Sequence, residues 1–302
     1  DRWMLMDAAG KPMLAWDEYK PKDDEAIVEE RLYATDYDRL HRPTAQWLTI
    51  DAKPRVKFER YEYQDAVRND ANNLNGQLIK HFDSSGLLET VRRDFKGNVE
   101  QVQRTLNNKP KESFIDWNAN PVANLENRTF VQITQYDALN RMTRLFNWHR
   151  TGKSVAVYIP MYGERGVLKS ERLIVGANKD NSPKGYRDGT ENDAIQDIRY
   201  DAKGQRQYLK LGKGIITHYD YDPETFRLKQ LRTTRPTYDP SFPDYHADLK
   251  DPNVLQQLHY TYDPVGNITE IHDEAYKMAY FQNAIIEPKN RYKYDALYRL
   301  IE

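Results

Sequence analysis

The chain has 302 residues, and its 45 basic and 46 acidic side chains leave a formal net charge of −1. It contains no Cys, which excludes disulfide scaffolds, Cys-ligated metal sites and a Cys nucleophile. A near-neutral charge without a basic block argues against nucleic acid as a partner, and no apolar run of about 18 residues is available to span a membrane.

Tyrosine is the most distinctive residue type, with 22 copies, and aromatic residues make up 12% of the chain. Leu, Ile, Val and Phe together reach only about a fifth, close to the level at which chains fail to build a core. Aromatic rings supply the missing burial area, so we predict a folded chain. The start, Asp1-Arg2-Trp3-Met4, has no initiator Met and no signal-peptide pattern, and we interpret the sequence as a segment of something longer.

Most of the predicted elements are strands. Two weak helix candidates lie early in the chain, at residues 23–32 and 64–72. Period-two alternation and β-branched or aromatic runs predict strands at 155–159, 209–211, 215–219, 258–262 and 268–272. The polar, Pro- and Gly-containing stretches at 178–193 and 235–252 are predicted to be loops.

One short pattern recurs along the chain: an aromatic or apolar residue, Asp, two variable residues, often Gly, then often a basic or amide residue. Nine copies start at Asp7, Asp38, Asp83, Asp94, Asp137, Asp201, Asp222, Asp263 and Asp295. The spacing between them is ragged, with several gaps near multiples of 21 residues and one of only 11. Degenerate copies such as Tyr61-Glu62 or Tyr238-Asp239 are candidates for the long gaps.

The pattern is typical of a tight turn. The Asp carboxylate can accept a hydrogen bond from the N–H two residues on, and the fourth position favours the left-handed conformation. Gly10, Gly86, Gly97, Gly204 and Gly266 take this position, and Asn140 is a good substitute. His41, Thr225 and Tyr298 suit it less well, so we expect their turns to differ in detail.

Each unit is therefore predicted to be a β-hairpin, and hairpins must stack because one alone cannot bury its apolar face. Tyrosine suits a sheet with two wet faces, since its ring covers apolar area and its hydroxyl meets water. We predict an all-β array of antiparallel hairpins forming a curved sheet over residues 1–302, without an internal domain boundary.

The longer strings around these turns resemble the YD repeats of Rhs (rearrangement hotspot) proteins. Residues 201–206 (DAKGQR), 219–228 (YDYDPETFRL), 260–269 (YTYDPVGNIT) and 292–302 (YKYDALYRLIE) resemble the Rhs region of insecticidal Tc-toxin B–C components and related large bacterial toxins. The resemblance covers essentially the whole chain. It implies a structural role, in which the YD-repeat sheet forms part of a hollow shell around a C-terminal toxic domain.

The resemblance also implies the partners: the enclosed toxic domain of the same polypeptide and a pore-forming toxin component. It implies a secreted bacterial toxin. The family's autoproteolytic motifs are not present, and Asp263-Pro264-Val265-Gly266 is interpreted as a turn without a catalytic role. We predict no cofactor, no metal and no enzymatic activity, and we assign the turn residues a structural role only.

Two alternatives remain open. The first is a cell-surface carbohydrate-binding or adhesion module, in which exposed Trp side chains stack on sugars. The second is an enzyme, for which no constellation combines a nucleophile or metal with a base. His259 and His272 flank one hairpin and can meet across strands, but ordinary surface histidines are favoured over a metal site. Asp220 and Asp222 form a carboxylate pair, although Asp222 is already explained by its turn.

Overall fold

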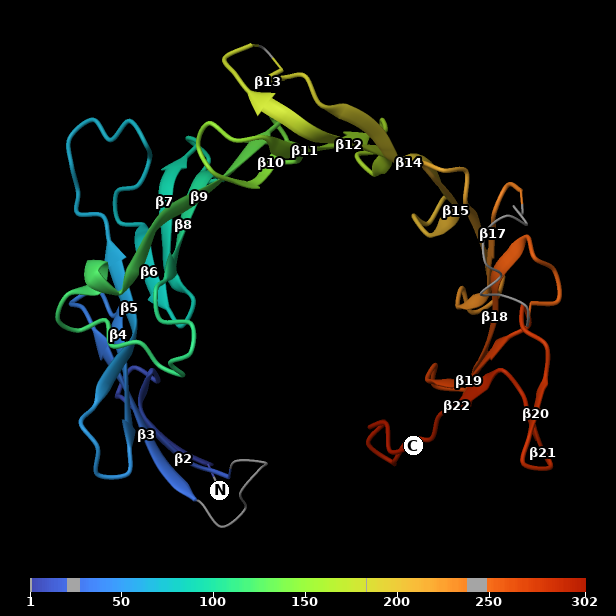
Figure 1. Cartoon of the computed structure of the whole chain (residues 1–302). Coiled ribbons are helices and arrows are strands. Elements are labelled where there is room, and N and C mark those ends of the chain that lie inside the picture. The colour runs from blue at the N-terminus through green and yellow to red at the C-terminus, as the bar shows by residue number, and fades with distance from the viewer. Residues whose placement is uncertain (1, 21–27, 183, 238–248) are drawn as a thin grey trace. The chain divides into compact units, whose positions relative to one another are not determined.

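The computed structural model describes residues 2–20, 28–182, 184–237 and 249–302, and nearly all its regular structure is antiparallel strand (Figure 1). The all-β prediction is confirmed. The chain divides into two compact units, which are described separately below. The first comprises Asp1–Val157 and Val175–Gly189, and the second comprises Tyr158–Ile174 and Thr190–Glu302. The organisation as one uninterrupted array stays a prediction.

The first unit contains a ten-strand meander in which each strand pairs antiparallel with the next. Its strands are β1 (Arg2–Met6), β2 (Pro12–Tyr19), β3 (Glu29–Tyr37), β4 (Pro43–Ile50), β5 (Val56–Tyr63), β6 (Leu78–Asp83), β7 (Gly86–Arg93), β8 (Val99–Asn107), β9 (Leu125–Tyr136) and β10 (Met142–His149). A short 3-10 helix, η1 (Pro121–Asn124), precedes β9, and the short strand β13 (Tyr186–Arg187) also belongs to this unit.

The second unit repeats this plan. Its main strands are β14 (Thr190–Tyr200), β15 (Arg206–Leu211), β16 (Ile216–Tyr221), β17 (Leu228–Thr234), β18 (Val254–Tyr262), β19 (Ile268–Asp273) and β22 (Lys289–Arg291), paired antiparallel in that order. Strands β20 (Ala279–Phe281) and β21 (Ala284–Ile286) form a separate hairpin. Strands β11 (Val155–Tyr162) and β12 (Leu168–Lys179) contribute residues to both units.

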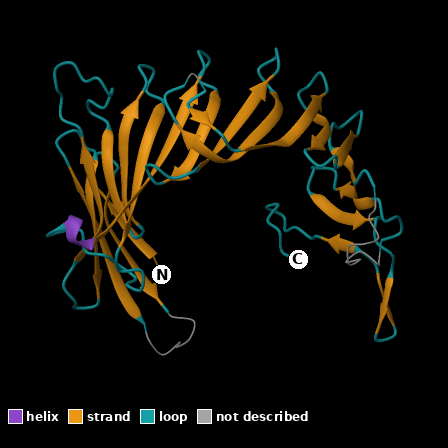
Figure 2. Ribbon diagram, turned by 45° about the horizontal axis from the view of Figure 1, so that its top comes forward, coloured by secondary structure: helices purple, strands orange, loops and turns teal. Residues whose placement is uncertain are grey.

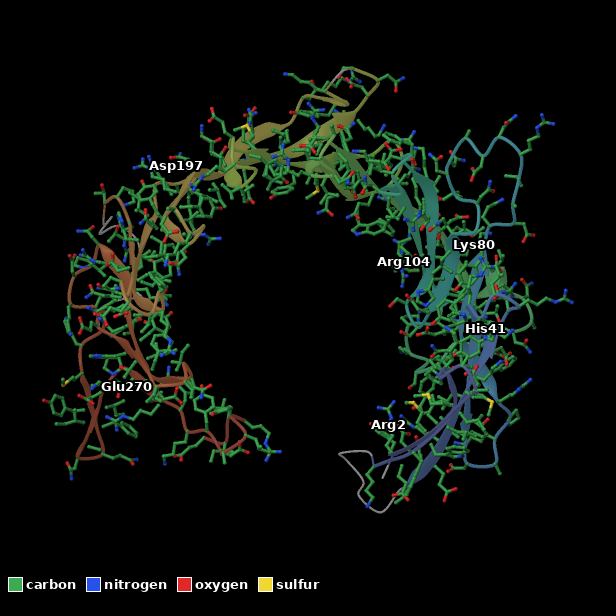
Figure 3. The ribbon with its side chains drawn as sticks, turned by 180° about the vertical axis from the view of Figure 1, so that it is seen from behind. Arg2, His41, Lys80, Arg104, Asp197 and Glu270 are labelled. Carbon is green, nitrogen blue, oxygen red and sulfur yellow. The ribbon has the colours of Figure 1, made fainter. Side chains whose placement is uncertain are left out.

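Within each unit the strands lie side by side in one layer (Figure 2), and side chains project from both sides of the ribbon (Figure 3). Most strand residues are accordingly half-buried, as in β5 and β8. This pattern agrees with the low aliphatic content, because a single layer has no thick core to fill.

Loops supply local cores where they fold onto a sheet. In the first unit, the segment between β8 and β9 brings Ile115 and Trp117 onto Phe82, and all three are buried. The Phe82 and Trp117 ring centroids lie 5.4 Å apart. The backbone N–H of Trp117 donates to the Lys57 carbonyl at 2.9 Å, which fixes the loop to β5. In the second unit, Leu249, Val254 and Ala275 form a smaller cluster of this kind.

Neither helix prediction is correct where the structure describes the chain. Residues 64–72 form turns and loop, in which Asp70 binds backbone N–H groups of the residues that follow it. Its carboxylate accepts hydrogen bonds from Asn72, Leu74 and Asn75. In the candidate at residues 23–32, the residues from Glu29 onward belong to β3, and residues 23–27 lie outside the described residues.

The loop predictions were partly wrong. Within 178–193, β14 begins at Thr190 and β13 forms a two-residue ladder with the end of β12, so polar composition hid strands with exposed faces. Of the second predicted loop, residues 238–248 lie outside the described residues. Its ends meet where the Arg235 N–H donates to the Asn253 carbonyl at 2.9 Å. The strands predicted at 155–159, 209–211, 215–219, 258–262 and 268–272 match β11, β15, β16, β18 and β19, although β16 begins only at Ile216.

Candidate functional site: a ladder of tyrosine–aspartate turns

The Asp turns gather at one edge of the sheet in each unit. Because strand direction alternates in a meander, every second connection returns to the same edge. The turns that begin at Asp7, Asp38, Asp94 and Asp137 occupy such connections in the first unit, and those at Asp201, Asp222 and Asp263 do so in the second. The turn at Asp295 follows β22. We call these turns the YD edge of each unit.

The turn at Asp201 shows the common geometry. The Asp201 N–H donates to the Gln205 carbonyl at 2.9 Å, and the Gly204 N–H donates to the Asp201 carbonyl at 3.2 Å. The Asp201 Oδ1 accepts the N–H groups of Lys203 and Gln205, both at 2.8 Å. Gly204 has a φ of +85°, in the left-handed region. The carboxylate thus fixes the loop while the glycine reverses it.

The other turns keep this backbone pattern with different fourth residues. Gly10, Gly97, Gly266 and Asn140 all have positive φ, and their N–H groups donate to the carbonyls of Asp7, Asp94, Asp263 and Asp137. His41 and Tyr298 do the same, at φ of 56° and 60°, so the expected difference in detail is absent there. The turn at Asp222 is one residue longer, and Phe226 rather than Thr225 takes the left-handed position.

Asp83 and Gly86 belong to a different kind of turn. They pair with each other across a two-residue β6–β7 hairpin, which lies between two YD-edge connections and therefore at the opposite edge. Gly86 has a φ of +133°, and a Cβ there would lie 2.2 Å from the Thr105 carbonyl oxygen of β8. Close strand approach therefore requires this glycine. The short gap of 11 residues in the sequence arises because Asp83 stands outside the YD-edge series.

The second carboxylate oxygen holds the side chain four residues on. The Nε atoms of Arg42, Arg141 and Arg299 lie 2.7–2.8 Å from Oδ2 of Asp38, Asp137 and Asp295. Asn98 and Asn267 take this place beside Asp94 and Asp263. The backbone N–H of the arginine is the main cause that lowers the pKa of Asp38, Asp137 and Asp295, and its guanidinium adds to the effect.

At five of these turns, the tyrosine before the Asp ties the turn to the preceding one. In the first unit, the Tyr37 hydroxyl donates to the Pro12 carbonyl at 2.7 Å, and Tyr136 donates to Val99 at 3.1 Å. In the second, Tyr221, Tyr262 and Tyr294 donate to the carbonyls of Arg206, Leu228 and Ile268 at 2.8–3.0 Å. Every acceptor is the first strand residue after the previous turn. Burial raises the pKa of Tyr37, Tyr221 and Tyr262, which keeps the donor proton in place.

Polar side chains add a second link between neighbouring turns. Arg42 donates to the Gly76 carbonyl at 3.0 Å, and the Asn98 amide donates to Asn140 Oδ1 at 2.9 Å. In the second unit, Gln205 donates to the Phe226 carbonyl at 2.7 Å. The guanidinium of Arg227 donates to the carbonyls of Asp263 and Pro264 at 3.0 and 3.3 Å. These residues occupy the position that is often basic or amide in the repeat.

Among the described residues, three further turns make these backbone bonds without an Asp, and the one at Leu211 joins β15 to β16 at the opposite edge. The Gly163 N–H donates to the Val167 carbonyl, and the Gly166 N–H donates to the Gly163 carbonyl, both at 2.9 Å. At Gln64, the same bonds run to Gln77 and Gly76 across an inserted loop. The tyrosines that precede Gly163 and Gln64, Tyr162 and Tyr63, are the sequence feature from which these two turns could have been predicted. The proposed copy at Tyr61-Glu62 is wrong, because both residues lie inside β5, and Tyr238-Asp239 lies outside the described residues.

The other residue pairs singled out from the sequence have structural surroundings. His259 and His272 are paired directly across β18 and β19, and His259 Nε2 lies 3.1 Å from Glu274 Oε2. Within the described residues, no group of three or more His, Asp or Glu side chains is arranged to hold a metal ion. Asp220 lies in β16, while the Asp222 carboxylate accepts the Thr225 N–H and hydroxyl. The same part of the chain offers no helix long and apolar enough to cross a bilayer.

Sequence comparison finds toxin subunits. The chain is 27% identical to the toxin subunit YenC2 of Yersinia entomophaga over 288 residues, which cover 93% of this chain and 27% of that protein. It is 29% identical to YenC1 of the same organism over 263 residues, or 83% of this chain and 23% of that protein. The predicted resemblance to Tc-toxin components is confirmed. No family model matches the chain.

Solved structures agree on the fold. A TcdB2–TccC3–Cdc42 crystal structure matches with a TM-score of 0.71 and 23% identity, covering 99% of this chain and 13% of that one. A Photorhabdus luminescens Tc holotoxin pore matches with a TM-score of 0.70 and 24% identity, covering 99% and 12%. The chain spans about a quarter of the length of the curated relatives it matches.

Proposed function

We propose that this chain forms part of the wall of a hollow β-shell, which sequesters a toxic C-terminal effector of the same polypeptide before a pore-forming component receives it. The wall acts mechanically and not as an enzyme. Similarity to toxin subunits over most of the chain supports this role, and it also supports the proposed secretion as a bacterial toxin.

The observation that carries the proposal is the YD edge. A wall must keep its strands in register although neither face has a second layer to hold it. Here Tyr hydroxyls and the basic or amide side chains that follow the turns join consecutive turns, as in the hydrogen bond from Tyr262 to the Leu228 carbonyl and those from Arg227 to the Asp263 and Pro264 carbonyls. Because each link contributes only about 1 kcal/mol, the strength of such a wall comes from repetition along the edge.

Limited proteolysis and electron microscopy of the full-length protein that carries this sequence test the proposal. We expect a closed chamber, and a downstream segment that resists protease until the shell is opened. A Tyr221→Phe/Tyr262→Phe double variant should release that segment at a lower urea concentration, whereas the exposed control Tyr280→Phe should not. An open sheet with no chamber, or a downstream segment cleaved at once in the native protein, would refute the proposed function.

A further inference from the structure

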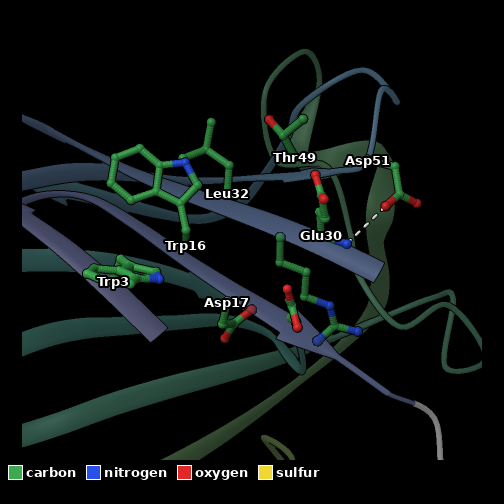
Figure 4. Close-up of a pocket in the computed structure, with 9 residues that line it drawn as sticks. Trp3, Trp16, Asp17, Glu30, Leu32, Thr49 and Asp51 are labelled. Carbon is green, nitrogen blue, oxygen red and sulfur yellow. Dashed lines mark hydrogen bonds between the residues drawn. The ribbon is translucent and has the colours of Figure 1, made fainter. Parts of the chain in front are cut away.

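The first unit contains a cavity of about 370 Å³ over strands β1 to β4 (Figure 4). One side of this cavity is formed by side chains that are paired directly across neighbouring strands. Trp3 pairs with Trp16, Trp16 pairs with Leu32, and Leu32 pairs with Thr49, so the four side chains share one face of the sheet. Trp3 and Trp16 are 69% and 39% exposed. Two indoles beside one another therefore present their surfaces to the cavity rather than to a protein core.

A row of carboxylates runs beside the indoles. Glu18 is paired directly with Glu30 across β2 and β3, two residues along from Trp16 and Leu32 and thus on the same face. Asp51 completes the row, and its Oδ1 accepts the Glu30 N–H at 2.9 Å. Like charges placed directly opposite each other destabilise a strand pair. Among the described residues, neither Glu18 nor Glu30 has a basic side chain in an ion pair with it.

The remaining charged residues of the cavity do not neutralise this row. The Arg31 guanidinium is bound by Glu29, which lies outside the cavity, at 2.7 and 3.1 Å. Asp17 is paired with Arg2 across β1 and β2 and with Arg31 across β2 and β3, so it lies on the sheet face opposite the indoles and the Glu18–Glu30 pair.

We propose that this cavity binds an organic cation, an ammonium group carried on an apolar chain. Indole faces attract cations through their quadrupole, and the carboxylates of Glu18, Glu30 and Asp51 add negative potential at the same place. A neutral sugar would use the indoles, but it would leave the Glu18–Glu30 repulsion in place. The shared chemistry fits either a small quaternary amine or a lysine side chain of a protein segment. This inference is independent of the proposed shell function.

Isothermal titration of the intact chain tests the proposal. The probes are choline, its neutral isostere 3,3-dimethylbutanol, N-acetyl-lysine methylamide and methyl glucoside. We expect saturable binding of one or both cations, weakening as NaCl is raised, and no binding of the two neutral probes. Choline alone would indicate a small-molecule ligand, and the lysine derivative alone a protein segment. Binding of a neutral probe as tightly as the cations, or of no cation, would overturn the proposal.

Variants separate binding from folding. Trp3→Ala and Trp16→Ala should each weaken cation binding by about 3- to 30-fold, whereas Trp148→Ala, an exposed tryptophan of β10, should leave it unchanged. Glu18→Gln should weaken binding while raising the urea midpoint of the free chain, because it relieves the pairing with Glu30. Equal affinity in the wild type and all three of these cavity variants would place the cation elsewhere and overturn the assignment.

Discussion

Two glycines of the YD edge, Gly204 and Gly266, allow the stability of a single turn to be measured separately from that of a contact between neighbouring turns. Both have positive φ, at +85° and +110°. A Cβ added at Gly204 would meet nothing within 4 Å, but one added at Gly266 would lie 2.9 Å from an Nη atom of Arg227. Gly204→Ala therefore adds backbone strain alone, whereas Gly266→Ala also displaces the guanidinium that binds the next turn.

The structure gives the magnitudes. Left-handed strain costs about 1–2 kcal/mol for a residue with a Cβ, so Gly204→Ala should lower the free energy of unfolding by that amount. Gly266→Ala should cost about 1 kcal/mol more, because the bonds from Arg227 to the Asp263 and Pro264 carbonyls are lost or weakened. The additional cost of Gly266→Ala over Gly204→Ala comes from the contact between residue 266 and Arg227. It should therefore disappear in a chain that already carries Arg227→Ala.

Urea unfolding followed by circular dichroism is the assay, arranged as a double-mutant cycle with Gly266→Ala, Arg227→Ala and the double variant. We expect a coupling of about 1 kcal/mol between the two positions. The matched cycle of Gly204→Ala with Arg227→Ala should show no coupling. Unchanged midpoints in both glycine variants would refute the turn assignment, and a coupling of zero at Gly266 would refute the link between turns.

Three further predictions address the other parts of the ladder. Tyr262→Phe should lower the free energy of unfolding by about 0.5–1.5 kcal/mol. An effect no larger than that of Tyr280→Phe would argue against a stabilising hydrogen bond from the Tyr262 hydroxyl to the Leu228 carbonyl. The pKa values of Asp38, Asp137 and Asp295 are lowered in the folded chain, so their ionised forms add stability above the unfolded value of about 3.9, and this contribution is lost as pH falls through the lowered folded pKa. The urea concentration at the unfolding midpoint should therefore decrease as the pH is lowered below about 4. The decrease should be steeper in the wild type than in an Asp38→Asn/Asp137→Asn variant, and equal slopes of midpoint against pH would contradict this. Gly163→Asp should restore the missing carboxylate and raise the free energy of unfolding by about 0.5–1 kcal/mol, whereas an effect equal to that of Gly163→Ala would mean that only backbone entropy had changed.

Local chemistry was readable from the sequence. Asp201, Lys203, Gly204 and Gln205 interact within five residues of one another, so composition and spacing were enough to indicate the turn and its left-handed position. The same is true of the alternating strands around it. Failures came where long-range pairing overrode local preference. The polar residues from Thr190 onward look like a loop in isolation, yet hydrogen bonds to a neighbouring strand make them part of β14.

By itself, the sequence determined the all-β class, the hairpin unit and the identity of most turn residues, because a tight turn is specified by the few side chains within it. Only the tertiary structure decided which edge each turn occupies. It separated Asp83 from the YD edge, added Gly163 and Gln64 to it, and paired Tyr37 with Pro12. These relations join residues that strand register brings together, and register depends on every intervening pairing, which no short window of sequence contains.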